Sequence, residues 1–373
     1  MKELIYADNA ATTKLDSEAF EAMKPFFLES YGNASQPYSF SRSVKKALKE
    51  ARHRIAQCIN AEDDEIFFTS GGTESDNWVI KGSMAYGDTR VVITSQIEHH
   101  AVLNACDAIE RFGYPVVYLP VDHAGIVEPE TLKLFISPNT KLVSIMMANN
   151  EIGTIQPIQE LCSIAHKNGA VFHTDAVQAV GHINIDVKSL GVDMLSASAH
   201  KFNGPKGIGF LYIKKGTLLS PLLDGGAQEQ KKRAGTENVP AIVGMSIALE
   251  NNCKLIRENK CKLLELEDQL ISHLHEKNID FIRNGAENHI PGNVSLSFKC
   301  IEGETLLHRL DLMGICVSTG SACDSVNTQL SHVLQAIKVD SSYASGTIRI
   351  SLGKGNTEND VKIIADSIST ILK

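Results

Sequence analysis

The sequence has few of the features that mark nucleic-acid-binding, membrane or secreted proteins. Its 373 residues include 36 Lys and Arg against 44 Asp and Glu, and the net charge of -8 argues against a nucleic-acid or anionic-membrane surface. No apolar run approaches the roughly 18 residues of a membrane span. Lys2, Glu3 and Asp8 interrupt the N-terminus, where a signal peptide would need an apolar segment. We therefore expect a cytoplasmic protein.

The eight cysteines also lack the spacing of a metal centre. None belongs to a CxxC pair, which argues against zinc, and a cytosolic chain of this size needs no disulfide framework. Most are expected to be small core residues. The glycine patterns of a nucleotide P-loop and of a dinucleotide-binding fingerprint are also missing, which disfavours a nucleotide-binding α/β protein.

Short apolar runs alternate with helix-length segments through the first two thirds of the chain. Runs that are apolar at successive positions are typical of strands buried on both faces. Seven candidate strands lie at 66–69, 91–94, 116–119, 142–147, 170–173, 194–197 and 209–213, with helices expected at 73–84, 101–112, 129–136 and 158–167. The pattern predicts an α/β fold with a seven-stranded, mostly parallel sheet covered by helices.

The alternation of short apolar runs and helix-length segments changes after Thr236. The chain is also longer than a single hydrophobic core usually organises. A long helical stretch at 239–275 is followed by candidate strands at 294–298 and 347–351, with helices at 303–313 and from Glu358. We expect two domains. The large domain comprises residues 14–250, and the smaller α+β domain comprises residues 1–13 and 251–373.

The stretch Ser198-Ala199-His200-Lys201 is the most informative in the chain. It follows a buried candidate strand, where desolvation disfavours the charged form of a lysine and so favours Schiff-base formation with a carbonyl. The Ser198 hydroxyl and the His200 imidazole can both hold a phosphate. Lysine beside phosphate donors suggests pyridoxal 5'-phosphate (PLP). An isolated strand-end lysine is more often a solvated side chain, so this interpretation depends on further motifs.

Other strand ends carry polar side chains that suit the same cofactor. Gly72 and Thr73 lie where a strand turns into a helix, and free N–H groups there can bind an anion. Asp175 can keep a pyridine nitrogen protonated, although alone it would be interpreted as a helix cap. His99 can stack on a flat ring or move protons as a catalytic residue, and Asn149 ends a fourth strand. Ligands bind at the carboxyl ends of strands in such sheets, so these residues predict an active site.

Together these motifs resemble the cysteine desulfurases of the NifS/IscS type, which are fold type I PLP enzymes of the class V aminotransferase family. The similarity runs nearly end to end, through segments 6–13, 68–75, 149–153, 173–178, 198–201, 225–229, 233–236, 321–323 and 348–353. It implies conversion of L-cysteine to L-alanine, with the sulfur held as a persulfide. It also implies a homodimer and an acceptor protein, such as an iron–sulfur scaffold or a tRNA thiolation enzyme.

The resemblance further implies roles for single residues. Lys201 would hold PLP as a Schiff base and act as acid and base, and Cys323 would be the nucleophile that takes the sulfur. Asp175 would pair with the pyridine nitrogen, Gln178 with the ring oxygen, and His99 with the ring face. The phosphate would bind Gly72, Thr73, Ser198, His200 and, from the other subunit, Thr236. The substrate carboxylate would bind Arg349, whose fork suits a carboxylate, together with Asn33 and Asn149. Asn149 would also contact the cofactor.

Several positions depart from the family pattern, namely Tyr38, Gln230, Thr319 and Asp324. The chain also ends at Lys373, where many members carry a longer tail that meets the scaffold protein. These departures leave open the sulfur acceptor and the choice between cysteine and selenocysteine. The alternatives are a selenocysteine lyase, another class V aminotransferase or lyase, and a non-catalytic partner subunit with a PLP fold. Cys323 argues against a transaminase, and the intact set of polar residues argues against a non-catalytic subunit.

Overall fold

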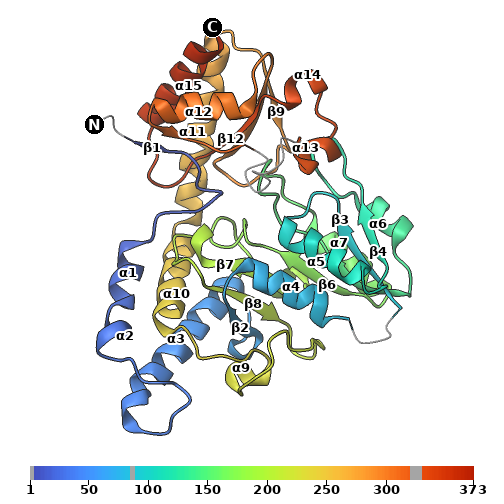
Figure 1. Cartoon of the computed structure of the whole chain (residues 1–373), viewed down its shortest axis with the longest axis vertical. Helices are drawn as coiled ribbons and strands as arrows, with labels where there is room; N and C mark the ends of the chain where they lie inside the picture. The colour runs from blue at the N-terminus through green and yellow to red at the C-terminus, as the bar shows by residue number, and fades with distance from the viewer. Residues whose placement is uncertain (1–3, 85–88, 320–329) are drawn as a thin grey trace.

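The structure is a computed structural model that describes residues 4–84, 89–319 and 330–373. Figure 1 shows two parts, one built around a large sheet and the other around a small sheet near the C-terminus. Within the described residues, no helix combines the length and apolar character needed to cross a bilayer.

The large sheet has seven strands in the order β2-β8-β7-β6-β5-β3-β4. Only β8 runs antiparallel to its neighbours, β2 and β7, while the remaining pairs are parallel. The strands are β2 (Ile66–Thr69), β3 (Val91–Ser95), β4 (Val116–Leu119), β5 (Thr140–Ser144), β6 (Val171–Asp175), β7 (Met194–Ser198) and β8 (Gly209–Ile213). This arrangement confirms the predicted fold class. The strand expected at 142–147 lies at 140–144 instead.

Helices cover both faces of this sheet, which explains why its strands are apolar at successive positions. Neighbouring residues of one strand enter different cores, as Leu142 and Val143 do. On one face lie α4 (Gly72–Gly82) and α5 (His100–Glu110). On the other lie α1 (Ser17–Met23), α3 (Arg42–Ile59), α6 (Pro129–Phe135), α7 (Ile158–Lys167) and α10 (Val239–Lys254). Short helices are α2 (Pro25–Leu28), α8 (Val187–Leu190) and α9 (Gln228–Lys231).

The C-terminal part contains a three-stranded antiparallel sheet with the order β12-β10-β9. Its strands are β9 (Phe281–Asn284), β10 (Asn293–Phe298) and β12 (Thr347–Ser351), and its longer helices are α11 (Ile256–Glu276), α12 (Gly303–Leu312) and α15 (Glu358–Leu372). Two short helices, α13 (His332–Ala336) and α14 (Ser341–Ala344), lie between these elements in sequence. The N-terminal strand β1 (Ile5–Tyr6) pairs in parallel with β11 (Ile315–Cys316), and Ile5 and Ala7 join this core.

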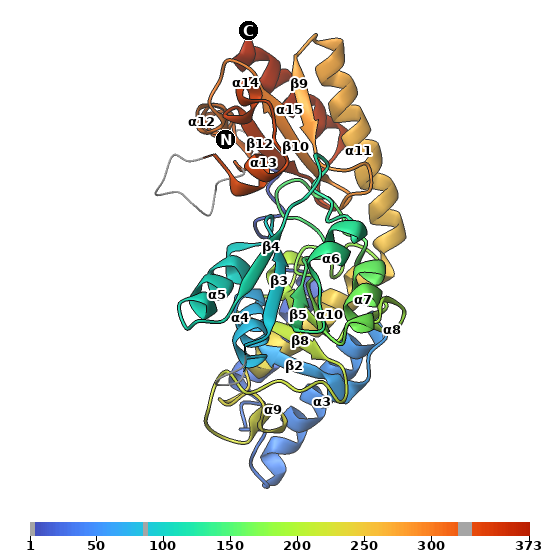
Figure 2. The ribbon, with the colours of Figure 1, turned by 90° about the vertical axis from the view of Figure 1, so that its right-hand side faces the viewer.

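The long helical stretch expected at 239–275 is two helices rather than one. Leu255, with φ -108° and ψ 6°, separates α10 from α11 and ends the first helix. Figure 2 shows α11 continuing upward from the region of α10 to flank the small sheet. Buried apolar residues form separate cores around the two sheets. The exact division into residues 14–250 and residues 1–13 with 251–373 stays a proposal.

Candidate active site

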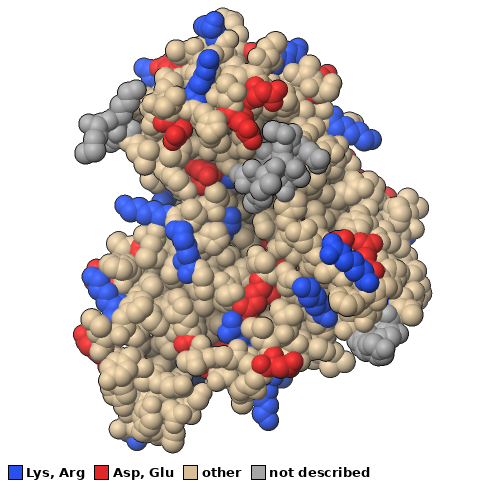
Figure 3. All heavy atoms as spheres, in the orientation of Figure 1, with Lys and Arg blue, Asp and Glu red and all other residues tan. Residues whose placement is uncertain are grey.

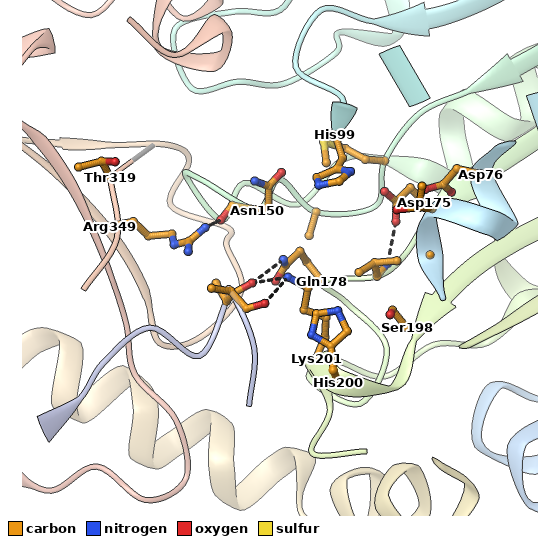
Figure 4. A pocket seen from close by; sticks show the side chains of 17 residues that line it. Asp76, His99, Asn150, Asp175, Gln178, Ser198, His200, Lys201, Thr319 and Arg349 are labelled. Carbon is orange, nitrogen blue, oxygen red and sulfur yellow. Dashed lines mark hydrogen bonds between the residues drawn. The ribbon is translucent and has the colours of Figure 1, made fainter. Parts of the chain in front are cut away.

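A cavity of about 320 Å³ lies where strands of the large sheet end and β12 approaches them. Figure 3 shows a hollow between the two parts of the molecule, with basic side chains at its border. Nine of the residues singled out from the sequence line the cavity, namely Gly72, Thr73, His99, Asp175, Gln178, Ser198, His200, Lys201 and Arg349. They come from segments far apart in the sequence, so the fold alone brings them together (Figure 4).

Lys201 follows β7 at the end of a single 3-10 turn, Ala199–Lys201. Its Nζ donates hydrogen bonds to the carbonyl oxygens of Ala10 at 2.6 Å and Ala11 at 3.0 Å. Thr13 binds the His200 carbonyl at 2.8 Å, so the N-terminal segment is tied to the lysine turn. The N-terminal residues therefore help to fix the position of the Lys201 amine.

Asp175 ends β6 with its carboxylate buried against the cavity. Its Oδ1 accepts the Val177 N–H at 2.9 Å. Burial raises the pKa of Asp175 to about 6, although the Val177 N–H and the Lys201 charge oppose this shift. A buried carboxylate of this kind, still ionised at neutral pH, fits a protonated ring nitrogen.

The N-terminus of α4 borders the cavity at Gly72 and Thr73. A Cβ at Gly72 would lie 2.6 Å from Val177 Cγ2, so only glycine allows this close packing. No side chain caps the first turn of the helix, which leaves backbone N–H groups available to an anion. The Ser198 side chain lies next to this turn, at 3.7 Å from the same Cβ position. The donors fit a phosphate group.

His99 caps α5 through its imidazole. Its Nδ1 accepts the Ala101 N–H at 3.1 Å, so the neutral ring carries its proton on Nε2. Burial, followed by the charges of Lys201, His100 and His332, lowers the pKa of His99 to about 4. Burial and Lys201 likewise lower the pKa of His200 to about 4. Both rings are neutral at physiological pH.

Arg349 projects from β12 into the opposite side of the cavity from Asp175 (Figure 4). Its Nη1 donates to the Asn150 carbonyl at 2.9 Å and its Nη2 to Asp8 Oδ1 at 2.8 Å. Its buried Nε has no hydrogen-bond partner among the described residues. A buried donor without a partner is costly, so this edge of the guanidinium fits an incoming carboxylate.

Three further predicted site residues, Asn149, Asn33 and Thr236, do not belong to the cavity lining. The Asn149 side chain is buried in its own turn, where it binds the Ile97 carbonyl and the N–H groups of Glu151 and Ile152, while its neighbour Asn150 lines the cavity. Asn33 accepts the Ser35 N–H, and Thr236 is exposed. Cys323 lies outside the described residues, and none of the seven described cysteines lines the cavity.

Sequence reasoning missed Asp76, which lines the cavity although it lies in the middle of α4. The spacing of Asp76 from Gly72 and Thr73 could have identified it. Residues three and four positions apart share a helix face, so Asp76 lies on the same face as Thr73 and Gly72. It also missed the backbone of Ala10 and Ala11, whose carbonyls bind Lys201 and whose side chains carry no chemical signal.

The sequence and the fold of this chain are similar to those of known proteins. The profile of the family described as aminotransferase class-V matches residues 5–364. A cysteine desulfurase IscS of Dictyoglomus turgidum is 50% identical over 100% of this chain and 95% of the relative. A solved NifS-like protein is 40% identical, covers 99% of both chains and superposes with a TM-score of 0.93. A structure of SspA in complex with cysteine is 35% identical over 94% of this chain and 99% of its own, with a TM-score of 0.83.

Proposed function

The chain belongs to the class V aminotransferase family, and we propose that it is a PLP-dependent cysteine desulfurase. It converts L-cysteine to L-alanine and takes the sulfur onto a cysteine as a persulfide for delivery to an acceptor. The observation that carries this proposal is one cavity that combines an amine, a buried carboxylate, an uncapped helix N-terminus and an arginine. PLP uses all four, since it needs a lysine, a partner for its ring nitrogen, a phosphate site and a binding group for the substrate.

The cavity residues divide the task of holding the cofactor. Lys201 is the residue for the covalent link, and Asp175 for the ring nitrogen. The N-terminus of α4, with Thr73, Ser198 and His200, suits the phosphate. When bound, PLP supplies an electron sink for the substrate amine. The neutral His99 ring offers an Nε2–H donor and a flat face, so we assign it stacking on the cofactor and not proton abstraction.

Arg349 binds the substrate carboxylate and so orients the rest of the substrate toward the sheet. Its unpartnered Nε and its fork geometry support this role. Lys201 is the only lysine among the described residues that line the cavity, and we assign to it the proton transfers at the substrate. The cysteine found with SspA supports cysteine as the substrate of this chain as well.

Cys323 remains our proposed nucleophile on the strength of its motif. Thr319 lines the cavity, and Cys323 follows it by four residues, a length of chain that spans at most about 14 Å. None of the seven described cysteines lines the cavity. The thiolate attacks the substrate sulfur, an S–S bond forms, the C–S bond breaks, and the electron pair of that bond stays with the carbon that becomes the alanine methyl group.

We also propose a cytoplasmic homodimer in which the partner's Thr236 completes the phosphate site. In one chain Thr236 is exposed and remote from the cavity lining, which agrees with a role in a neighbouring subunit. An acceptor protein of the iron–sulfur or tRNA thiolation type would collect the sulfur. Selenocysteine lyase activity remains the second candidate, because the same carboxylate and amine contacts suit selenocysteine.

The deciding experiment measures alanine and sulfide released from L-cysteine by the PLP-loaded protein. Cys323→Ala should retain PLP binding but lose persulfide and alanine formation. Cys261→Ala, at an exposed position of α11, is the matched control and should keep both. Borohydride reduction should fix the cofactor on Lys201. Undiminished turnover of L-cysteine by Cys323→Ala would contradict the desulfurase mechanism, and selenocysteine turnover alone would favour the second candidate.

A further inference from the structure

Three carboxyl groups are buried together at the cavity, where Asp76 and Asp175 belong to its lining and Glu98 does not. Asp76, Asp175 and Glu98 are 1%, 5% and 0% exposed, and the charges of Asp175 and Glu98 act on Asp76. Figure 4 shows Asp76 beside Asp175 on the side of the cavity away from Arg349. Three ionised carboxylates in one buried space would repel one another strongly, so the cluster must keep part of its protons.

Hydrogen bonding separates the three carboxyl groups. Asp175 accepts a backbone N–H and faces the charge of Lys201, both of which favour its ionised form. Asp76 Oδ1 has no hydrogen-bond partner among the described residues, and neither does Glu98 Oε2. An unpartnered, fully buried carboxyl oxygen is the expected position of a proton, because an ionised oxygen there would lack both solvent and donors.

The histidine beside Asp76 cannot balance a second negative charge. His173 Nε2 is 3.7 Å from Asp76 Oδ1, and its two ring nitrogens are already bound to Ser144 and Ser196, each at 2.9 Å. Burial lowers the pKa of His173 to about 3, so the ring is neutral. Burial and the charge of Asp175 raise the pKa of Asp76, and Ser196 opposes this rise. The hydrogen-bonded series Ser144–His173–Ser196 beside Asp76 carries no charge.

We propose that Asp76 is a positioning residue that stays protonated at neutral pH and leaves Asp175 as the only ionised carboxylate of the cluster. The inference rests on the proposed function, since the single ionised carboxylate, that of Asp175, would pair with the protonated ring nitrogen of PLP. Burial raises the pKa of Asp76 well above its usual value, and the Asp175 and Glu98 charges raise it further. Burial raises the pKa of Glu98 to about 8, which keeps this second carboxyl largely neutral as well.

Asp76→Asn tests the proposal, because an amide has nearly the shape of a protonated carboxyl group. We expect the Kd for PLP at pH 7 to stay within about twofold of the wild-type value. Asp175→Asn should weaken PLP binding about 10-fold to 100-fold, the range for loss of a charge-assisted bond. A loss in Asp76→Asn as large as that in Asp175→Asn would overturn the proposal, because Asp76 would then be an ionised partner.

The pH dependence of unfolding gives a readout that does not depend on turnover. Asp76 is protonated when folded but ionises above about pH 4 when unfolded, so its own contribution to stability falls as pH rises from 5 to 8. Relative to the wild type, thermal unfolding of PLP-loaded Asp76→Asn should therefore shift toward higher stability as pH rises over this range. An unchanged slope would show that Asp76 holds no proton in the folded state and would overturn the proposal.

Infrared spectra of the wild type cover the case in which the variant fails to fold. With isotopically labelled aspartate, a buried protonated carboxyl should give a shifted carbonyl band that persists at pH 7. Absence of this band would also overturn the proposal. If these tests succeed while L-cysteine is not consumed, the desulfurase assignment fails and the role of Asp76 in the PLP site stands.

Discussion

The guanidinium of Arg349 is paired with the carboxylate of Asp8, with 2.8 Å between Nη2 and Oδ1. Asp8 follows β1, and Arg349 lies on β12, so the pair joins two segments far apart in the sequence beside the cavity. Asp8 occupies an N–H that a bidentate substrate carboxylate needs. Arg349 therefore already holds an internal carboxylate with which the substrate must compete.

Asp8→Asn should lower the KM for L-cysteine about fivefold without a matching change in kcat. The amide still accepts the Nη2–H, but it removes the competing negative charge, an effect of about 1 kcal/mol at a partly exposed pair. Arg349→Lys is the control and should raise KM, because lysine lacks the fork. A higher KM in Asp8→Asn would mean that Asp8 orients Arg349 and does not compete for it.

His99 should contribute no ionisation to the pH–rate profile between pH 5 and pH 8. Its pKa is lowered to about 4, so the ring is neutral throughout this range. His99→Asn should lower kcat, because the flat ring is lost, while keeping stability, because asparagine also caps helices. His99→Ala should lose about 1 kcal/mol of stability in addition. An acid limb near pH 6 that disappears in His99→Asn would contradict this assignment.

Hybrid dimers should reveal whether two subunits share each site. Lys201→Ala lacks the amine, and Thr236→Ala should bind PLP less tightly while keeping Lys201. In a shared site, a dimer with one subunit of each kind has one site with both defects and one site with neither. We expect such hybrids to recover about half of the wild-type activity per dimer. Recovery no greater than the average of the two parents would contradict a shared site.

The thiols of Cys58 and Cys253, on the packed helices α3 and α10, interact with each other. This interaction lowers the pKa of Cys253 and raises the pKa of Cys58. Alkylation should therefore modify Cys253 before Cys58, and Cys58→Ala should slow the modification of Cys253. Peptide mass spectrometry measures both rates. Faster modification of Cys253 in Cys58→Ala would show that Cys58 only shields its neighbour.

Much of the fold could be predicted because strands buried on both faces are apolar at every position. Phe67 and Phe68 show this, since they enter different cores from the same strand. The break at Leu255 was not predictable from composition, because leucine favours helices and the helical pattern continues on both sides. The break is seen only in the structure, where the backbone angles of Leu255 end α10 and α11 begins.

The site was predicted where chemistry follows a strand end and missed where it depends on packing. Lys201 and Asp175 end strands and so carried a signal. Asp76 lies within a helix, and the carbonyls of Ala10 and Ala11 belong to residues without functional side chains. The placement of Asn150 in the cavity lining, with Asn149 turned into its own loop, depends on one residue of register in a tight turn.

The pairing of β1 with β11 has a consequence for how the chain folds during its synthesis on the ribosome. Ile5 pairs with Ile315, and the Asn9 N–H binds the Ser351 carbonyl, so this N-terminal segment is synthesised long before its partners. Contacts so distant in sequence close a long loop and form slowly. Because Ala10 and Ala11 hold the Lys201 amine, a nascent chain has its large sheet before it has a finished site. Capture of the cofactor therefore follows the synthesis of β11 and β12.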